Sequence, residues 1–180
     1  MRTQPTTIKA FNLTIGPMEF AERSGWDVII NVNDTMPVNT STQVFWLPID
    51  QVTFWGYPVF FATKRILDEH FKRHSRILVH CMMGAHRSRM IVYAWLLSRG
   101  LKGPAIDELM GGNYTDTFKT AVRQNHIPSD LPLFFDVMNQ DREACLAQVM
   151  IGLAKAQQLK TRAFGAALGI PCTALTGPPW

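Results

Sequence analysis

The fold of this chain is indicated most clearly by residues 76–97, which have the sequence RILVHCMMGAHRSRMIVYAWLL. Residues 76–80 form a compact aliphatic run, which is typical of a strand buried on both faces. Residues 90–97 are helical by pattern, and Gly100 ends that helix. The loop between them therefore lies at the carboxyl end of a buried strand, where open α/β sheets bind their ligands.

The pattern on either side of this segment predicts strands that alternate with helices. Strands are expected at 11–15, 27–32 and 43–47, and helices at 19–24, 57–73, 104–110 and 115–125. Such an order indicates an α/β domain with a central, mostly parallel sheet of about four to five strands flanked by helices.

The last part of the chain differs in composition. Residues 133–168 are mostly strong helix formers, and residues 171–180 contain three prolines and a glycine. We therefore expect a catalytic domain over 1–140, and a helical extension with a Pro-rich tail over 141–180. The segment 141–168 either covers the domain or docks a partner or a second copy.

Composition excludes several classes of protein. The chain has 180 residues, 47% hydrophobic and 18% charged, with a mean hydropathy near zero, as expected of a soluble globular protein. A net charge of +4 is too small to indicate nucleic-acid binding. Three scattered cysteines form no disulfide framework and no zinc spacing. No apolar stretch reaches the ~18–20 residues of a membrane span, so we expect a cytoplasmic protein.

The loop after the buried strand carries the residues of an anion site. Gly84 allows a positive φ and close approach of the backbone, and Arg87 opens the helix with a planar fork that matches two phosphate oxygens. Cys81 lies at the base of the loop, where backbone dipoles and Arg87 favour the thiolate. A thiolate in such a cradle is a nucleophile for phosphorus, and Ser88 can donate its hydroxyl when the sulfur leaves.

The arrangement His-Cys-x-x-Gly-x-x-Arg-Ser resembles the signature of the cysteine-based protein tyrosine phosphatases. The resemblance implies a phosphatase-like α/β fold over about residues 10–140. It also implies catalytic roles for Cys81, Arg87 and Ser88, with His80 tuning the loop, and no metal or cofactor. The phosphate would be bound by the backbone N–H groups of the loop and by Arg87; the other loop residues are Met82, Met83, Gly84, Ala85 and His86. The short chain is most similar to the dual-specificity branch.

This branch has a general-acid aspartate some thirty residues before the cysteine. Asp50 follows a strand and Pro48, and it precedes Cys81 by 31 positions, so the resemblance favours it as the acid. An aspartic acid can protonate the leaving group and then activate the hydrolytic water. Asp34, after the preceding strand, is the rival, and a turn or capping role for Asp50 is the alternative.

Other residues near the motif have weaker signals. Arg89 is expected on the helix surface more than at a second phosphate contact. His86 either adds charge near the phosphate or faces solvent. Residues 72–89 hold five Lys or Arg and no acid, which suits an anionic substrate or a solvated helix end. Phe54 and Trp55 either contact an aryl phosphate or pin the acid loop to the core, and we favour the core.

The function expected from these residues is that of a protein phosphatase. It would hydrolyse phosphotyrosine, and also phosphoserine or phosphothreonine, in phosphorylated proteins. One alternative is a phosphoinositide or RNA 5′-phosphate phosphatase. The Met and Ala side chains of the loop disfavour the lipid substrate, because the loop of the lipid phosphatases contains lysines that bind the additional phosphates. The other alternative is a phosphate-binding module without turnover, which the intact Cys81, Arg87 and Asp50 disfavour.

Overall fold

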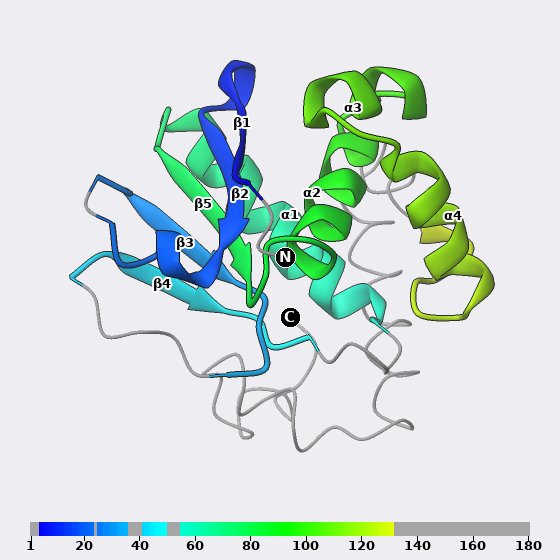
Figure 1. Cartoon of the computed structure of the whole chain (residues 1–180), viewed down its shortest axis with the longest axis horizontal. Helices are drawn as coiled ribbons and strands as arrows, with labels where there is room; N and C mark the ends of the chain where they lie inside the picture. The colour runs from blue at the N-terminus through cyan, green and yellow to red at the C-terminus, as the bar shows by residue number, and fades with distance from the viewer. Residues whose placement is uncertain (1–3, 24, 36–40, 50–54, 132–180) are drawn as a thin grey trace, which may run out of the picture.

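The computed structural model describes residues 4–23, 25–35, 41–49 and 55–131. A five-stranded sheet in the order β1-β2-β5-β3-β4 organises this part of the chain (Figure 1). Strand β1 is antiparallel to β2, and the other neighbours are parallel. The strands are β1 (Thr6–Ile8), β2 (Leu13–Pro17), β3 (Val28–Asn31), β4 (Gln43–Trp46) and β5 (Ile77–Cys81).

Strand β5 lies at the centre of the sheet, between β2 and β3. All five of its residues are buried, as the aliphatic run predicts. Its last residues align with the ends of both neighbours: Cys81 is opposite Pro17, and His80 is opposite Asn31. The carboxyl ends of the parallel strands therefore meet at the loop that follows Cys81.

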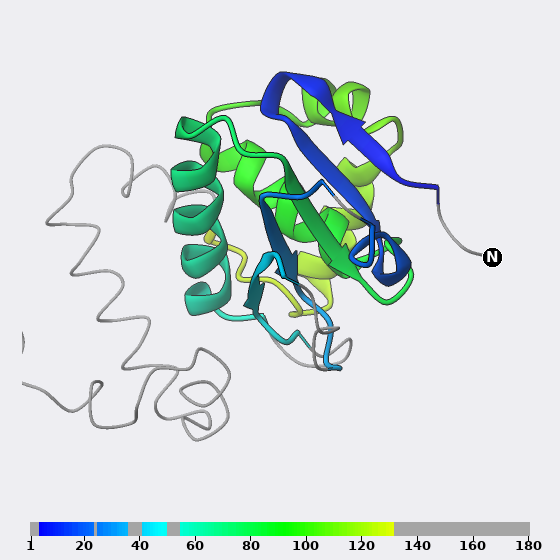
Figure 2. The same cartoon turned by 90° about the vertical axis from the view of Figure 1, so that its left-hand side faces the viewer.

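The four α-helices of the described residues gather on one side of the sheet (Figures 1 and 2). They are α1 (Tyr57–Lys72), α2 (Arg87–Ser98), α3 (Gly103–Met110) and α4 (Tyr114–Arg123). Helix α2 contacts α1, α3, α4 and the sheet, and it is buried on nearly every side. The opposite face of the sheet is covered by a smaller cluster of Ala21, Ile29 and Leu78, with Phe20 and Trp26 packed against it.

The α/β sheet and most of its elements confirm the sequence-based expectations, with two differences. Helix α2 begins at Arg87, as expected, although the apolar pattern starts only at Met90; the helix expected over 19–24 is a single 3-10 turn, η2 (Met18–Phe20). Strand β1 was not expected, and a 3-10 turn, η1 (Lys9–Phe11), links it to β2. The extension over 141–180 lies outside the described residues. Within the described part, no helix has the length and apolarity to cross a membrane.

Candidate active site

Cys81 is placed at the end of β5, where its side chain is 3% exposed. Its Sγ lies 3.4 Å from the Ser88 Oγ at the start of α2. Burial raises the pKa of the thiol, but the Ser88 hydroxyl and the backbone N–H groups of Ser88, His86 and Gly84 oppose it, and the net pKa is lowered. These donors stabilise a thiolate, so the structure brings together the cysteine, the serine and the loop as the sequence predicts.

The backbone of the loop between Cys81 and Arg87 is arranged as a cradle of donors. Among the described residues, the N–H groups of 83–86 donate to no backbone carbonyl. The N–H groups of Gly84, His86 and Ser88 lower the pKa of the Cys81 thiol, so they face its sulfur. Consecutive N–H groups that face one concavity at a helix N-terminus bind anions.

Gly84 sets the shape of this cradle. Its φ is +66°, and a Cβ at this position would lie 2.5 Å from both the Gly16 carbonyl carbon and the Pro17 nitrogen. The loop is thus pressed against the end of β2, and the Met18 N–H also donates to the Met82 carbonyl at 3.3 Å. Only glycine meets both the conformational and the steric requirement here.

Arg87 is buried and is held from two loops. Its Nη1 donates to the Ile49 carbonyl at 2.7 Å, and its Nη2 donates to Asn33 Oδ1 at 2.8 Å. The Asp34 carboxylate lies 3.3 Å from Nη1. Its Nε is buried and has no hydrogen-bond partner among the described residues. The guanidinium is therefore fixed through its two terminal nitrogens, while Nε keeps its donor for a ligand.

Asn33 is a site residue that the sequence reasoning missed. It is completely buried, and its N–H donates to Asn31 Oδ1 at 2.8 Å. Its carbonyl accepts from Trp46 Nε1 at 2.9 Å, and its side-chain amide donates to the Thr35 hydroxyl. These bonds orient Oδ1 towards Arg87. The available signal was a polar Asn33 just after a buried strand that itself ends in Asn31, at the edge of the sheet that also carries the loop.

Of the two candidate acids, Asp34 lies within the described residues and Asp50 does not. Ile49, the residue before Asp50, is 2% exposed, and its carbonyl accepts a hydrogen bond from Arg87. The described part of this loop therefore ends beside the guanidinium. Asp34 is described, and its carboxylate is paired with Arg87. The structure thus brings Asp34 to the site as well.

The two histidines of the motif are both partly or fully removed from water. His80 is 1% exposed, and burial lowers its pKa to about 4, against a smaller opposing effect of the Cys81 backbone. His86 is half-buried, with its ring 5.6 Å from the Trp55 ring in an edge-on contact. Burial, followed by His126 and Arg87, lowers the pKa of His86. Both rings are therefore neutral at neutral pH, and the charge of the site comes from arginine.

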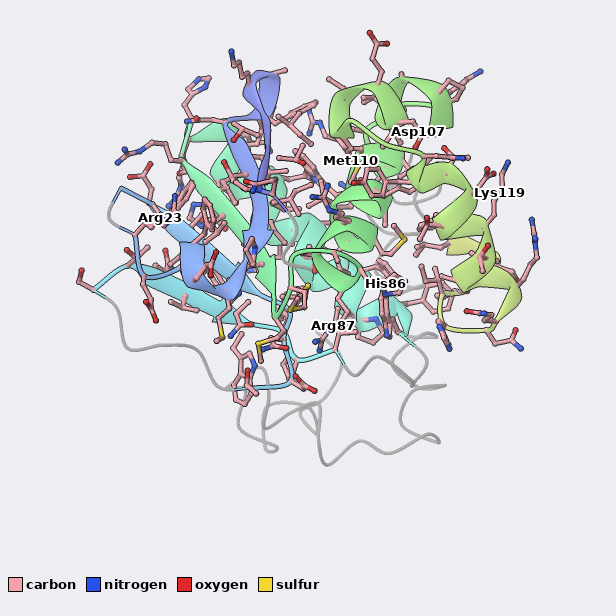
Figure 3. All side chains as sticks on the ribbon, viewed as in Figure 1. Arg23, His86, Arg87, Asp107, Met110 and Lys119 are labelled. Carbon is pink, nitrogen blue, oxygen red and sulfur yellow. The ribbon has the colours of Figure 1, made fainter. Side chains whose placement is uncertain are left out.

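The mouth of the loop is apolar. Met82 and Met83 are each 38% exposed, and they are the exposed large apolar side chains of the described residues. Trp55 is 1% exposed and packs in the core, as favoured from the sequence, whereas Phe54 lies outside the described residues. Figure 3 shows the side chains of His86 and Arg87 at this end of the molecule, with His86 on the side of α4.

The basic run 72–89 separates into two groups. Arg73 and Arg76 precede β5 and lie at its other end, exposed and paired with Glu69 and Asp27, so for them the alternative of a solvated helix end holds. The expectation for Arg89 is wrong, because Arg89 is not a surface residue. It is 2% exposed and its Nε donates to the Gly84 carbonyl at 2.8 Å. The sequence does not indicate that Arg89 is buried, because Arg89 follows Arg87 and Ser88 and so looks like part of a polar segment.

A lowered thiol pKa, a cradle of N–H groups and a fixed guanidinium together form a site that can hold an anion beside a thiolate. The family model described as dual specificity phosphatase, catalytic domain, matches residues 12–103. This is just over half of the chain, and the chain therefore belongs to the dual specificity phosphatase family. No curated protein matches the sequence. Within the described residues, no cluster of three or more His, Cys, Asp or Glu side chains could hold a metal ion.

Solved structures of similar fold agree with this assignment. Tk-PTP in its active form is 21% identical, with a TM-score of 0.50, and the match covers 70% of this chain and 98% of that one. DUSP15 is 15% identical, with a TM-score of 0.51 and coverage of 73% and 94%. OH1 from the Orf virus, a tyrosine phosphatase, is 12% identical, with a TM-score of 0.51 and coverage of 75% and 84%. At these identities the likeness shows the fold.

Proposed function

We propose that this chain hydrolyses phosphotyrosine, and also phosphoserine or phosphothreonine, in protein substrates through a cysteinyl-phosphate intermediate. The observation that carries the proposal is the environment of Cys81 Sγ. The Ser88 hydroxyl lies 3.4 Å away, and the backbone N–H groups of Ser88, His86 and Gly84 favour the thiolate and lower the pKa of the thiol. Family membership supports a protein phosphatase, and this environment supports the thiolate as its nucleophile.

In the first half of the reaction, the phosphate dianion lies in the cradle of N–H groups and accepts from Arg87 Nε. The Cys81 thiolate attacks phosphorus, the S–P bond forms and the P–O bond to the leaving group breaks. Asp50 gives its proton to the leaving oxygen. Arg87 stabilises the equatorial oxygens because Asn33 and the Ile49 carbonyl hold its guanidinium in place beforehand.

In the second half, the ionised Asp50 takes a proton from a water molecule, which attacks phosphorus. The S–P bond breaks, and its electron pair returns to the Cys81 sulfur. The Ser88 hydroxyl donates to the departing thiolate from 3.4 Å. Inorganic phosphate leaves, and the enzyme returns to its starting state with no metal or redox cofactor in the cycle.

The rim of the site supports a protein substrate over an inositol lipid. The exposed side chains next to Cys81 are those of Met82 and Met83, which offer apolar contact to the ring or chain that carries the phosphate. The two arginines of the motif are buried, so neither of them presents a cation at the rim for additional phosphates. This is the chemistry of a monophosphorylated side chain.

The test uses the full chain and p-nitrophenyl phosphate. We expect hydrolysis that vanadate inhibits and that Cys81→Ser abolishes, whereas the matched variant Cys145→Ser keeps it. A panel of phosphotyrosine, phosphoserine and phosphothreonine peptides, phosphoinositides and triphosphate RNA then defines the substrate. Binding of phosphopeptide without turnover would contradict the proposal. Preferential hydrolysis of the lipid or the RNA would show that the substrate is not a phosphorylated protein.

A further inference from the structure

A second arginine is buried behind the loop, two residues after Arg87. Arg89 has its side chain on the first turn of α2 and is 2% exposed. Its Nε donates to the Gly84 carbonyl at 2.8 Å and its Nη2 to the Gln4 carbonyl at 3.1 Å. Its Nη1 donates to the Tyr114 hydroxyl at 2.6 Å and to Thr6 Oγ1 at 3.1 Å. One side chain thus joins the catalytic loop to β1 and α4.

The charge of Arg89 is not neutralised by these contacts. Each of its four acceptors is a neutral oxygen, and the Tyr114 ring lies 5.1 Å from the guanidinium carbon. Among the described residues, no carboxylate forms an ion pair with it. A buried cation without a carboxylate is costly to retain, and the positive potential it produces acts on whatever lies nearby. Here the nearest functional group is the loop that holds Cys81.

The bond to Gly84 has a geometric consequence for the cradle. No peptide bond among the described residues is cis, so the carbonyl of Gly84 and the N–H of Ala85 point in opposite directions from one planar unit. Because Arg89 holds this carbonyl from outside the loop, the Ala85 N–H is directed away from Arg89. The charged donor also polarises the peptide, which strengthens that N–H as a donor. The N–H of Gly84, on the preceding peptide unit, is one of the groups that lower the pKa of the Cys81 thiol.

We propose that Arg89 is a positioning residue of this phosphatase, which fixes the peptide unit between Gly84 and Ala85 in the loop and adds a second positive charge behind the site for the phosphate dianion and the thiolate. The proposal rests on the function proposed above. It assigns Arg89 no contact with the substrate, and it differs from the role of Arg87, whose Nε remains available to the phosphate.

The experiment compares the full-length wild type with Arg89→Met and Arg89→Lys. The first readout is the pH dependence of Cys81 alkylation by iodoacetamide, followed by peptide mapping so that the other cysteines do not interfere. The second is vanadate affinity, and the third is kcat and KM for p-nitrophenyl phosphate. Neither of the first two requires turnover, so an inactive wild type would refute the proposed function while the inference about Arg89 is still decided.

For Arg89→Met we expect the alkylation midpoint to move to higher pH and vanadate affinity to fall about tenfold, because a charge and a charge-assisted hydrogen bond are lost together. Arg89→Lys keeps the charge but not the shape of the fork, so its midpoint should stay near that of the wild type while vanadate affinity still falls. The elements around Cys81 carry other ionisable groups, none of which these substitutions change: Glu19, Asp34, His80, His86, Arg87 and His126.

The matched control is Arg99→Met, at the opposite end of α2. Arg99 stacks 4.6 Å from the Phe71 ring and pairs with Asp68 at 3.1 Å, without contact to the loop. It should change stability but neither the midpoint nor vanadate affinity. If Arg89→Met does not fold, Tyr114→Phe removes one acceptor but keeps the charge, so it should lower vanadate affinity by less and leave the midpoint unchanged. A folded Arg89→Met with the midpoint and vanadate affinity of the wild type would overturn the proposal, as would a Tyr114→Phe variant with the vanadate affinity of the wild type where Arg89→Met does not fold.

Discussion

The two ends of strand β5 contain arginines in very different states. At the amino end, Arg76 is 56% exposed and lies 3.6 Å from Asp27, and Arg73 pairs with Glu69 at 2.8 Å. At the carboxyl end, Arg87 and Arg89 are each 2% exposed and bind backbone carbonyls as well as side chains. The sequence places all four within one basic run, but the fold separates them by the length of the strand.

This difference shows that burial, and not the count of charges, determines which arginines act at the site. Five residues of strand extend over roughly 16 Å, which exceeds the ~8 Å screening length of physiological salt. Exposed pairs at the amino end are therefore screened from the phosphate. Buried guanidinium groups at the carboxyl end act through a low dielectric, and their geometry is fixed by the loops around them.

The largest effect is expected for Arg87→Lys, with Arg76→Lys as the matched change at the other end of β5. A lysine cannot donate to Asn33, to the Ile49 carbonyl and to a phosphate oxygen in the plane of one fork. We expect kcat/KM to fall about 100- to 1000-fold for Arg87→Lys, and to stay within about twofold for Arg76→Lys. Near-normal activity of Arg87→Lys would contradict the role given to the fork.

The next effect concerns the acid. Asp50→Ala should lower kcat about 100-fold on substrates with poor leaving groups and far less on those with good ones, because only the former need a proton. Asp34→Ala should lower activity equally on both, since Asp34 contacts Arg87 and not the leaving group. A series of aryl phosphates with different leaving-group pKa values measures how kcat of each variant depends on the leaving group. A steep leaving-group dependence that appears in Asp34→Ala alone would transfer the acid role to Asp34.

Gly84→Ala tests the close approach of the loop to β2. The new Cβ would meet the backbone of Gly16 and Pro17 at 2.5 Å, in addition to the strain of a positive φ. We expect a loss of about 2–4 kcal/mol in the free energy of unfolding. Gly111→Ala is the control, because Gly111 also has a positive φ (+68°) but no atom within 4 Å of the new Cβ. It should cost about 1 kcal/mol, and equal losses measured by urea unfolding would argue against the packing.

His80 gives a dependence of stability on pH. Its folded pKa of about 4 is below the ordinary value of 6.5, so the unfolded chain binds the extra proton between these values. Stability from this group is therefore fully present above pH 6.5 and is lost as the pH falls towards 4, by up to about 3 kcal/mol. The free energy of unfolding of the wild type, minus that of His80→Gln, should decrease over this window. A flat difference would show that His80 is not buried as described.

The smallest effect is expected from the amino end of β5. The double variant Arg73→Gln and Arg76→Gln removes two exposed charges, each paired on the surface. Activity should stay within about twofold and stability within about 1 kcal/mol at physiological salt. A large loss of kcat/KM with unchanged folding would mean that the basic run acts as one unit, which would remove the distinction between the two ends.

Much of the fold follows from local sequence. Residues 76–80 and 27–32 are aliphatic runs that became the buried centre of the sheet, β5 and β3, and the pattern over 57–73 became α1. Strand β1 has three residues and pairs along the sheet edge, so its signal is too short to be distinguished from a loop. The apolar pattern of α2 starts only at Met90, because the first turn consists of the polar residues 87–89, although all three are buried.

The centre of the site was predictable because its residues are consecutive, from His80 to Ser88. The residues that fix it were not, because they come from distant parts of the chain. Asn33 reaches Arg87 across 54 positions, and the backbone of Gln4 reaches Arg89 across 85. Such contacts depend on the register of the sheet and on loop conformation, which no local pattern contains. Polar residues at these positions are indistinguishable in sequence from solvated ones.

The central claim is that Cys81 becomes phosphorylated during turnover. The direct measurement is a rapid denaturing quench of the full chain reacting with an aryl phosphate, followed by peptide mapping by mass. The account predicts one added phosphoryl group on the sulfur of Cys81, which accumulates in Asp50→Ala because hydrolysis of the intermediate is slowed, and which is absent in Cys81→Ser. A phosphoryl group on His80 or His86, or hydrolysis that continues in Cys81→Ser, would contradict the account.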